Sequence, residues 1–300
     1  MTSGDRQDDR MAELQEKRSR AESPWRIALR MLTKNRAAMA ALGILCVIAL
    51  TAIFAPLISP YDPNEVDILN QLQDPSREHI LGTDLYGRDI LSRIFWGGRV
   101  TLVVGLISVG IAATFGILLG LVSGYRGGAT DSVIMRFIDI LLAFPRMLLA
   151  LTIVGMLGPG LLNVMLAVGI ASITGYARLV RGTVLSAKEA TYVEAARVVG
   201  CRNNRIMFRH CLPNVIGPVI VLATLDIAAA ILAASALSFL GLGVQPPTAE
   251  WGYMLNEGRN YLRAAPWITF FPGMAIMISV LVINMLGDGL RDALDPRMKI

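Results

Sequence analysis

The sequence predicts an all-α membrane protein with six transmembrane helices and one short helix on the cytoplasmic side. Of its 300 residues, 54% are hydrophobic and only 17% are charged, and the mean hydropathy is +0.55. A soluble core of this size would not bury so much apolar surface. Several uncharged runs reach the roughly 20 residues that span a hydrocarbon core of about 30 Å. Because these runs lack the alternation of a membrane β-strand, helices are the expected form.

The six expected spans follow the long apolar runs. They are expected at residues 38–59, 100–124, 131–156, 161–184, 213–239 and 267–287. In the second span Gly116, Gly120 and Gly124 recur at every fourth position. This spacing predicts that the glycine face packs closely against another helix.

Lysine and arginine are distributed unevenly between the two sides of the predicted membrane region. Nine lie before span one, 2 at the connection after span two (Arg126 and the adjoining Arg136), 7 from Arg178 to Arg209 and 3 after span six, together 21 of the 28. The alternate segments hold 4 and 2, and Arg146 lies within a span. The positive-inside rule therefore places both termini and the loop between spans four and five in the cytoplasm. The net charge of +5 follows from this bias, so nucleic-acid binding is not expected.

The ends of the chain differ in composition from the membrane region. Residues 1–22 are polar and are expected to form a disordered cytoplasmic tail. Ser23-Pro24 can begin a helix, and residues 23–36 are expected to lie on the inner leaflet as an amphipathic helix. The main transmembrane domain is expected at residues 100–290, followed by a cytoplasmic tail at residues 291–300.

Two segments are predicted on the outer side. Residues 37–99 are expected to contain the first span and then an exposed, irregular excursion that ends in a short helix near residues 88–95. The second outer segment, residues 244–266, is expected to pack over the outer mouth of the helix bundle. The alternative is that Trp251 and Trp267 are plain interfacial anchors.

The basic loop at residues 186–213, between the fourth and fifth spans, is the most informative stretch. Thr191 is expected to cap a short helix, and Glu194, three residues later, to return the hydrogen bond. Gly200 is expected to supply the left-handed residue that ends the helix about two turns later. A short, capped cytoplasmic helix is suited to being held by another protein.

Asp139, Arg146 and Asp226 are ionisable residues that lie deep within the predicted spans. Each costs about 2.5–3.5 kcal/mol at the centre of a span, so they should face protein or water. They are expected either to line a polar conduit or to form structural pairs within the bundle, with Asp226 as a candidate partner for Arg146. Pro145 directly precedes Arg146 and can kink the third span.

Self-contained catalysis is not expected. The sequence lacks the phosphate loop GxxxxGK[ST] and also lacks HExxH, CxxC and GxSxG. Its two histidines, His79 and His210, fall on opposite sides of the predicted membrane. A metal site or catalytic triad built on histidine is therefore improbable, and no cofactor is expected in the chain.

The loop at residues 186–213 resembles the hallmark loop of binding-protein-dependent ABC importers, specifically the C-type permease subunit of the dipeptide, oligopeptide and nickel group. The hallmark pattern is EAA, any three residues, G, any nine residues, I, any one residue, and LP. In this chain His210 occupies the position where the pattern has Ile. The matching residues are Glu194, Ala195, Ala196, Gly200, Leu212 and Pro213. Further blocks similar to this group lie at residues 81–84, 238–243 and 287–296, and the resemblance covers about residues 35–298.

The resemblance implies the type I importer permease fold and a subunit that forms half of a translocation pathway. It implies that the helix at residues 191–200 is a coupling helix, which sits in a cleft of a separate ATPase subunit. The residues assigned to this coupling are Thr191, Glu194, Ala195, Ala196, Gly200, Leu212 and Pro213. The implied partners are a second homologous permease, two ATPase subunits that bind ATP and Mg, an extracytoplasmic solute-binding protein and the lipid of a prokaryotic cell membrane.

The solute and two rival classes stay open. Dipeptides or oligopeptides are the expected solutes, with a nickel chelate or glutathione as alternatives. A self-sufficient, ion-driven carrier would instead use Asp139, Arg146 and Asp226, and the chain alone in liposomes would then respond to an ion gradient. A membrane enzyme would turn over without partners, and the missing catalytic motifs disfavour it.

Overall fold

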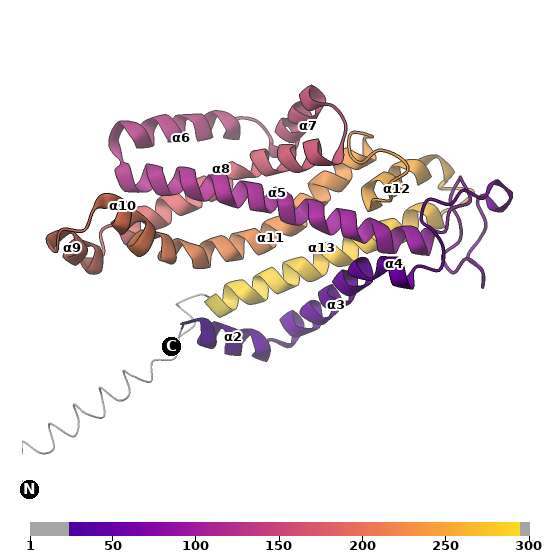
Figure 1. Cartoon of the computed structure of the whole chain (residues 1–300), viewed down its shortest axis with the longest axis horizontal. Coiled ribbons are helices and arrows are strands. Elements are labelled where there is room, and N and C mark those ends of the chain that lie inside the picture. The colour runs from indigo at the N-terminus through magenta and orange to yellow at the C-terminus, as the bar shows by residue number, and fades with distance from the viewer. Residues whose placement is uncertain (1–23, 295–300) are drawn as a thin grey trace, which may run out of the picture.

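The computed structural model describes residues 24–294, with side chains from residue 29 onward. The predicted tail at residues 1–22 and the last six residues of the predicted tail at residues 291–300 lie outside the described part. Within it, the chain folds into long helices that run side by side in one elongated bundle, with no β-strand (Figure 1).

Five helices are long and apolar enough to cross a membrane, and a bent pair raises the number to six if it counts as one span. The described helices are α2 (Pro24–Lys34), α3 (Arg36–Ile53), α4 (Ala55–Ile58), α5 (Ile90–Arg126), α6 (Gly128–Leu142), α7 (Arg146–Leu157), α8 (Leu161–Ala187), α9 (Thr191–Val198), α10 (Asn203–Ile206), α11 (Leu212–Phe239), α12 (Trp251–Gly258) and α13 (Trp267–Leu294). Short 3₁₀ turns lie at Ile68–Asn70 and Arg259–Tyr261, and a π-helical turn lies at Met207–Cys211. The predicted all-α membrane fold is confirmed.

The third predicted span, residues 131–156, is not one continuous helix. It is divided into α6 and α7, whose axes meet at 90°. Pro145 precedes the first residue of α7 and has no N–H group, so it cannot donate a helical hydrogen bond. Its ring also disfavours the helical conformation at the preceding residue, Phe144. The kink predicted at this proline is therefore present, but as a complete break between two helices.

The glycine face of α5 packs closely against α8, as predicted. A Cβ atom at Gly120 would lie 2.5 Å from the carbonyl oxygen of Ala177, and one at Gly124 would lie 2.9 Å from that of Arg181. Gly116 meets the same helix one turn earlier. Only residues without a side chain permit this approach of two backbones.

The first outer segment is partly buried, which corrects the expectation that it is exposed. Arg88 Nε donates to Asp84 Oδ2 at 2.6 Å, and its Nη2 donates to both carboxylate oxygens of Glu257 at 2.8 and 2.9 Å. Arg93 is also buried and lies 3.3 Å from Glu257. The short helix expected at residues 88–95 is wrong as a separate element, because α5 begins at Ile90 and continues through the span.

The second outer segment packs on the bundle through α12. Trp251 is 3% exposed and its Nε1 donates to the carbonyl of Ile94 at 2.9 Å, while Trp267 Nε1 donates to the carbonyl of Thr83 at 3.1 Å. Both indoles therefore donate to protein carbonyls, and Trp251 is too deeply buried to be a plain interfacial anchor, whereas for the partly exposed Trp267 this alternative stays a prediction. Glu250 caps α12 by accepting from the N–H groups of the following helix, and burial raises the pKa of its carboxyl group.

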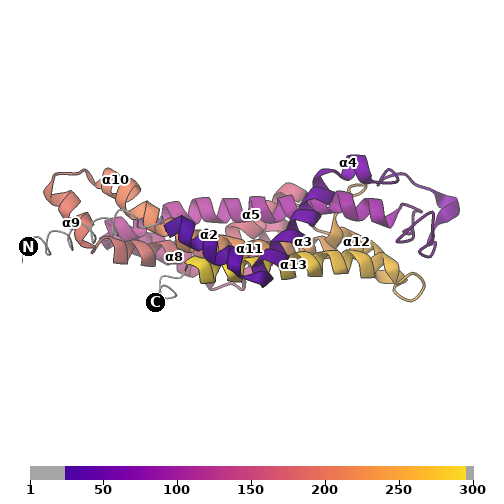
Figure 2. The ribbon, with the colours of Figure 1, turned by 90° about the horizontal axis from the view of Figure 1, so that it is seen from below.

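The elements divide between the two ends of the bundle. α9 and α10 lie at one end, and α2 and the last turns of α13 lie toward the same end (Figures 1 and 2). α4, α12 and the loop between α4 and α5 lie at the other end. α2 occupies the segment for which the amphipathic helix is predicted, and its place on a membrane surface stays a prediction.

Candidate functional site

The candidate site is the coupling segment, residues 186–213, which joins α8 to α11. Its central element, α9, has eight residues, which matches the predicted two turns. The predicted cap is wrong: the N-cap is Ala190, and Thr191 is the first helical residue. Ala190 is extended, and its carbonyl accepts from the N–H groups of Val193 at 2.8 Å and Glu194 at 3.3 Å. The helix therefore begins one residue earlier than a capping box would require, and the Glu194 side chain is left exposed.

Gly200 ends α9 in the predicted way. Its φ is +85°, in the left-handed region. The N–H of Gly200 donates to the carbonyl of Arg197 at 2.9 Å, and the N–H of Cys201 donates to that of Ala196 at 3.0 Å. This pair of bonds is a Schellman motif, which satisfies the last carbonyls of the helix. Open space surrounds the position that a Cβ atom would occupy, so a substitution here would strain the backbone without a steric clash.

α9 has one buried face and one exposed face. Val193 is fully buried in the main core of the bundle, and Ala196 packs partly against the same core. In contrast, Val198 and Val199 at the end of the helix are 87% and 83% exposed. Ala195 is exposed as well. Two adjacent apolar side chains are therefore left open at the outermost part of the bundle.

A side-chain bond ties α9 to α11. Asn214 Nδ2 donates to the hydroxyl of Tyr192 at 2.9 Å and to the carbonyl of His210 at 2.7 Å. Asn214 lies in the first turn of α11, just after Leu212 and Pro213, and the proline is favourable at the start of a helix because it needs no N–H partner there. No local sequence pattern points to Tyr192, because its hydrogen-bond partner is 22 residues away.

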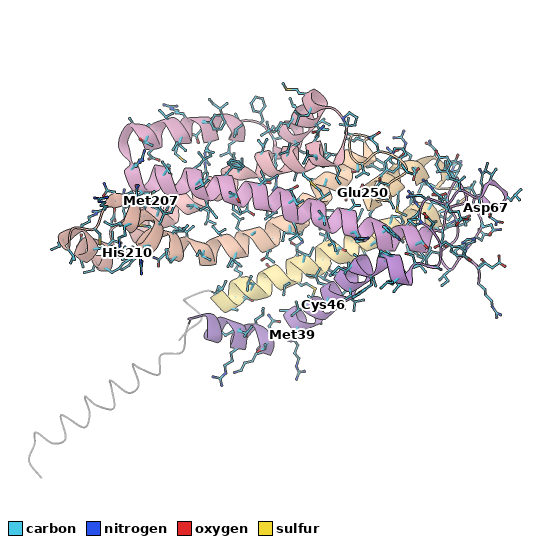
Figure 3. All side chains as sticks on the ribbon, viewed as in Figure 1. Met39, Cys46, Asp67, Met207, His210 and Glu250 are labelled. Atoms are coloured by element: carbon cyan, nitrogen blue, oxygen red, sulfur yellow. The ribbon has the colours of Figure 1, made fainter. Side chains whose placement is uncertain are left out.

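Two further bonds attach the coupling segment to α5. Tyr125 Oη donates to Asn203 Oδ1 at 3.1 Å, and Lys188 Nζ donates to the carbonyl of Gly124 at 3.3 Å. Met207, labelled in Figure 3 beside this end of α5, is buried in the main core. The segment is therefore held by α5, α8 and α11 and does not hang as a loose loop.

The pairing of Arg146 with Asp226 is present in the membrane region. Arg146 Nη2 lies 2.8 Å from Asp226 Oδ1 and also donates to Ser172 Oγ, and the hydroxyl of Tyr176 donates to Asp226 Oδ2 at 3.3 Å. Asp226 is buried, whereas 40% of the Arg146 side chain stays exposed. The cluster joins the start of α7 to α8 and α11, next to the break in the third span.

Asp139 does not join this cluster. It pairs with Arg178 of α8 at 2.6 Å, and about half of each side chain is exposed. One turn nearer the coupling segment, Arg181 binds both oxygens of Asp131 at 2.6 Å each. Arg178 and Arg181 lie 39 and 50 residues from their acidic partners in α6, so no local sequence pattern indicates these pairs. The exposed pair indicates that this face meets water or another protein, because lipid would not solvate it.

Fold and site together define a class: a multi-pass membrane protein that presents a rigid, partly apolar helix at one end of its bundle. Residues 116–300 match the family described as binding-protein-dependent transport system inner membrane component. Residues 23–75 match the N-terminal transmembrane domain of oligopeptide transport permease C. The chain belongs to this family and is a permease subunit of a binding-protein-dependent ABC importer.

Relatives resemble the chain over nearly its whole length. The dipeptide transport system permease protein DppC of Alkalihalophilus pseudofirmus is 50% identical over 279 residues, which cover 93% of this chain and 92% of the relative. The di/tripeptide transport system permease protein DppC of Pseudomonas aeruginosa is 46% identical over 92% of this chain and 93% of its own. The glutathione transport system permease protein GsiD of Pectobacterium atrosepticum is 46% identical over 92% of both chains.

Proposed function

We propose that this permease imports short peptides and that α9 receives the movement of separate ATPase subunits. The relatives named above carry dipeptides, di- and tripeptides or glutathione, which is itself a tripeptide. The proposed assembly contains this chain, a second homologous permease, two ATPases that bind ATP and Mg, and an extracytoplasmic solute-binding protein. In a prokaryotic cell membrane, α9 and both termini then face the cytoplasm, in keeping with the distribution of Lys and Arg.

The rigid attachment of α9 is the observation that carries this proposal. The helix is anchored at its buried face by Val193, is closed at its end by Gly200 and is bonded to α11 through Tyr192. A short helix held in this way moves as a rigid body, so a push on its exposed face reaches α8 and α11. A loose loop would absorb the same push.

The ionisable residues of the membrane region have two proposed roles. The Arg146–Asp226 pair holds the broken third span against α11, and the exposed part of Arg146 faces the solute pathway. The Asp139–Arg178 pair lies on a face that another subunit or the pathway covers. Asp226→Ala would leave the partly buried guanidinium group of Arg146 without its carboxylate partner, so it should lower the recovery of folded protein.

Reconstitution in liposomes tests the proposed function. The chain is purified with its second permease and ATPases, and a radiolabelled dipeptide is offered with the solute-binding protein. We expect uptake that requires ATP and every subunit. Uptake by this chain alone under an ion gradient would instead establish an ion-driven carrier, and an assembled complex that moves no peptide would contradict peptide import.

A further inference from the structure

A hollow of about 650 Å³ lies between α8, α11 and α13, at the end of the bundle that carries α9. This volume is within the range of about 300–1,000 Å³ that is usual for small-molecule sites. Its walls are mainly apolar and include Leu179, Val221 and Leu225. Two polar residues, Asn214 and Arg291, also line it.

Glycines keep this hollow open. Gly175 of α8 and Gly217 of α11 both line it, and no atom lies within 4 Å of the position that a Cβ would take at either residue. They differ from Gly120, whose missing side chain admits a neighbouring helix. The space above Gly175 and Gly217 is therefore available to a molecule from outside the described chain.

One cation lines the hollow, and one backbone carbonyl of a lining residue lacks its usual helical donor. Pro218 lies inside α11 and has no N–H, so the carbonyl of Asn214, four residues earlier, lacks its usual helical donor. Arg291 is exposed near the end of α13, and none of the described carboxylates lies within 4 Å of its guanidinium group. A guanidinium group suits a carboxylate, and a free carbonyl suits an N–H donor.

We propose that this hollow is an inner chamber that holds the transported peptide at the α9 end of its path. Arg291 binds the terminal carboxylate, and the Asn214 carbonyl accepts a hydrogen bond from an N–H group of the peptide. The apolar walls contact the peptide side chains and do not distinguish between them by hydrogen bonding. This inference rests on the proposed import of peptides and deepens it, because Asn214 also bonds to Tyr192 and so links the chamber to the coupling segment.

Filling the chamber tests the inference. In the complete reconstituted complex, Gly217→Leu should lower the uptake of a tripeptide by about tenfold or more and affect a dipeptide less, because the added side chain removes volume. Subunit recovery and ATP hydrolysis should stay at the wild-type level. The matched control is Gly110→Leu in α5, since Gly110 also has no neighbour within 4 Å and does not line the hollow.

A second variant tests the carboxylate contact without changing the volume. Arg291→Gln should lower the uptake of a peptide with a free carboxylate by about tenfold, the typical worth of one hydrogen bond to a charged group. It should leave the uptake of the same peptide with a C-terminal amide unchanged. Wild-type peptide uptake by both Gly217→Leu and Arg291→Gln would contradict the proposed inner chamber.

Two other molecules could fill the hollow in place of the peptide, and the result expected for each would contradict the proposed inner chamber. If a helix of the second permease fills the hollow, Gly217→Leu will prevent recovery of that subunit. If a lipid chain fills it, the purified wild-type chain will retain phospholipid that Gly217→Leu loses, and peptide uptake will not change. If the wild-type complex takes up no peptide, the proposed function itself is contradicted. If the wild type takes up peptide normally and the variants are unaffected, only the inner chamber is contradicted.

Discussion

Asn214 donates a hydrogen bond from its side-chain amide to the hydroxyl of Tyr192 at 2.9 Å, and this bond is a direct link between α9 and the first turn of α11. α11 continues from this turn through the bundle and carries Asp226, the partner of Arg146. A displacement of α9 is thus passed to a helix that reaches the polar cluster in the membrane region.

Loss of this bond should weaken coupling without preventing assembly. Tyr192→Phe removes only the hydroxyl group, at a cost of about 1 kcal/mol, which corresponds to about a fivefold loss of peptide uptake per ATP hydrolysed. The measurement is the ratio of uptake to ATP hydrolysis in proteoliposomes. Tyr125→Phe is the matched control, because it removes the bond between α5 and Asn203 and leaves α11 untouched. An equal loss in both variants would contradict the specific link.

The end of α9 should tolerate asparagine at Gly200 but not valine. A β-branched residue at φ +85° costs about 1–2 kcal/mol, so Gly200→Val should disturb the helix end, weaken ATPase association and uncouple transport. Asparagine adopts the left-handed conformation more readily, and Gly200→Asn should retain most of both properties. Copurification of the ATPases and peptide uptake report the two effects. Normal values for Gly200→Val would show that the Schellman motif has no part in coupling.

Much of the fold follows from local sequence. Long uncharged runs predict the membrane helices because the backbone must bond internally in lipid. The spacing of Gly116, Gly120 and Gly124 predicts that this face of α5 packs against another helix, which the structure identifies as α8, and Gly200 predicts the end of α9, because both features depend on the absence of a Cβ atom.

The incorrect predictions depend on relationships that local sequence does not contain. The start of α9 is set by the extended backbone of Ala190, a residue with no capping side chain. The buried position of Arg88 depends on Glu257, which is 169 residues away. Pro145 predicts a kink, but the 90° angle between α6 and α7 is set by their packing and by the pairing of Arg146 with Asp226.

The contact between α5 and α8 should be intolerant of any side chain at Gly120. Gly120→Leu places atoms against the backbone of Ala177 and should lower the free energy of unfolding by about 1–3 kcal/mol. Gly110→Leu, on an open face of the same helix, should have little effect. Thermal unfolding in detergent compares the two variants. Equal midpoints would contradict the close packing.

The outer segment should depend on Glu257. Glu257→Ala leaves the buried guanidinium groups of Arg88 and Arg93 with Asp84 as their remaining carboxylate partner, and it should destabilise the protein by about 3–5 kcal/mol. Glu65→Ala removes an exposed carboxylate from the same outer region and should be nearly neutral. Limited proteolysis of residues 60–89 provides a direct readout. An unchanged rate of cleavage in Glu257→Ala would argue against the buried network.

Glu250 should give stability a measurable pH dependence. Burial raises its pKa above the ordinary value of 4.5, so the folded state holds this proton more firmly than the unfolded state. From the ordinary value up to the raised value, the free energy of unfolding of the wild type should therefore fall as the pH rises. Glu250→Gln does not titrate, so the wild type should lose stability relative to this variant across that window. A difference in melting temperature that does not vary with pH would contradict the burial of the carboxyl group.

We propose that α9 is the part of this permease on which its ATPases act. The decisive measurement is a cryo-EM reconstruction of the assembled, transport-competent complex. We predict that residues 191–200 lie against an ATPase subunit, with the exposed side chains of Val198 and Val199 covered. The claim is contradicted if these residues touch no other chain in that complex.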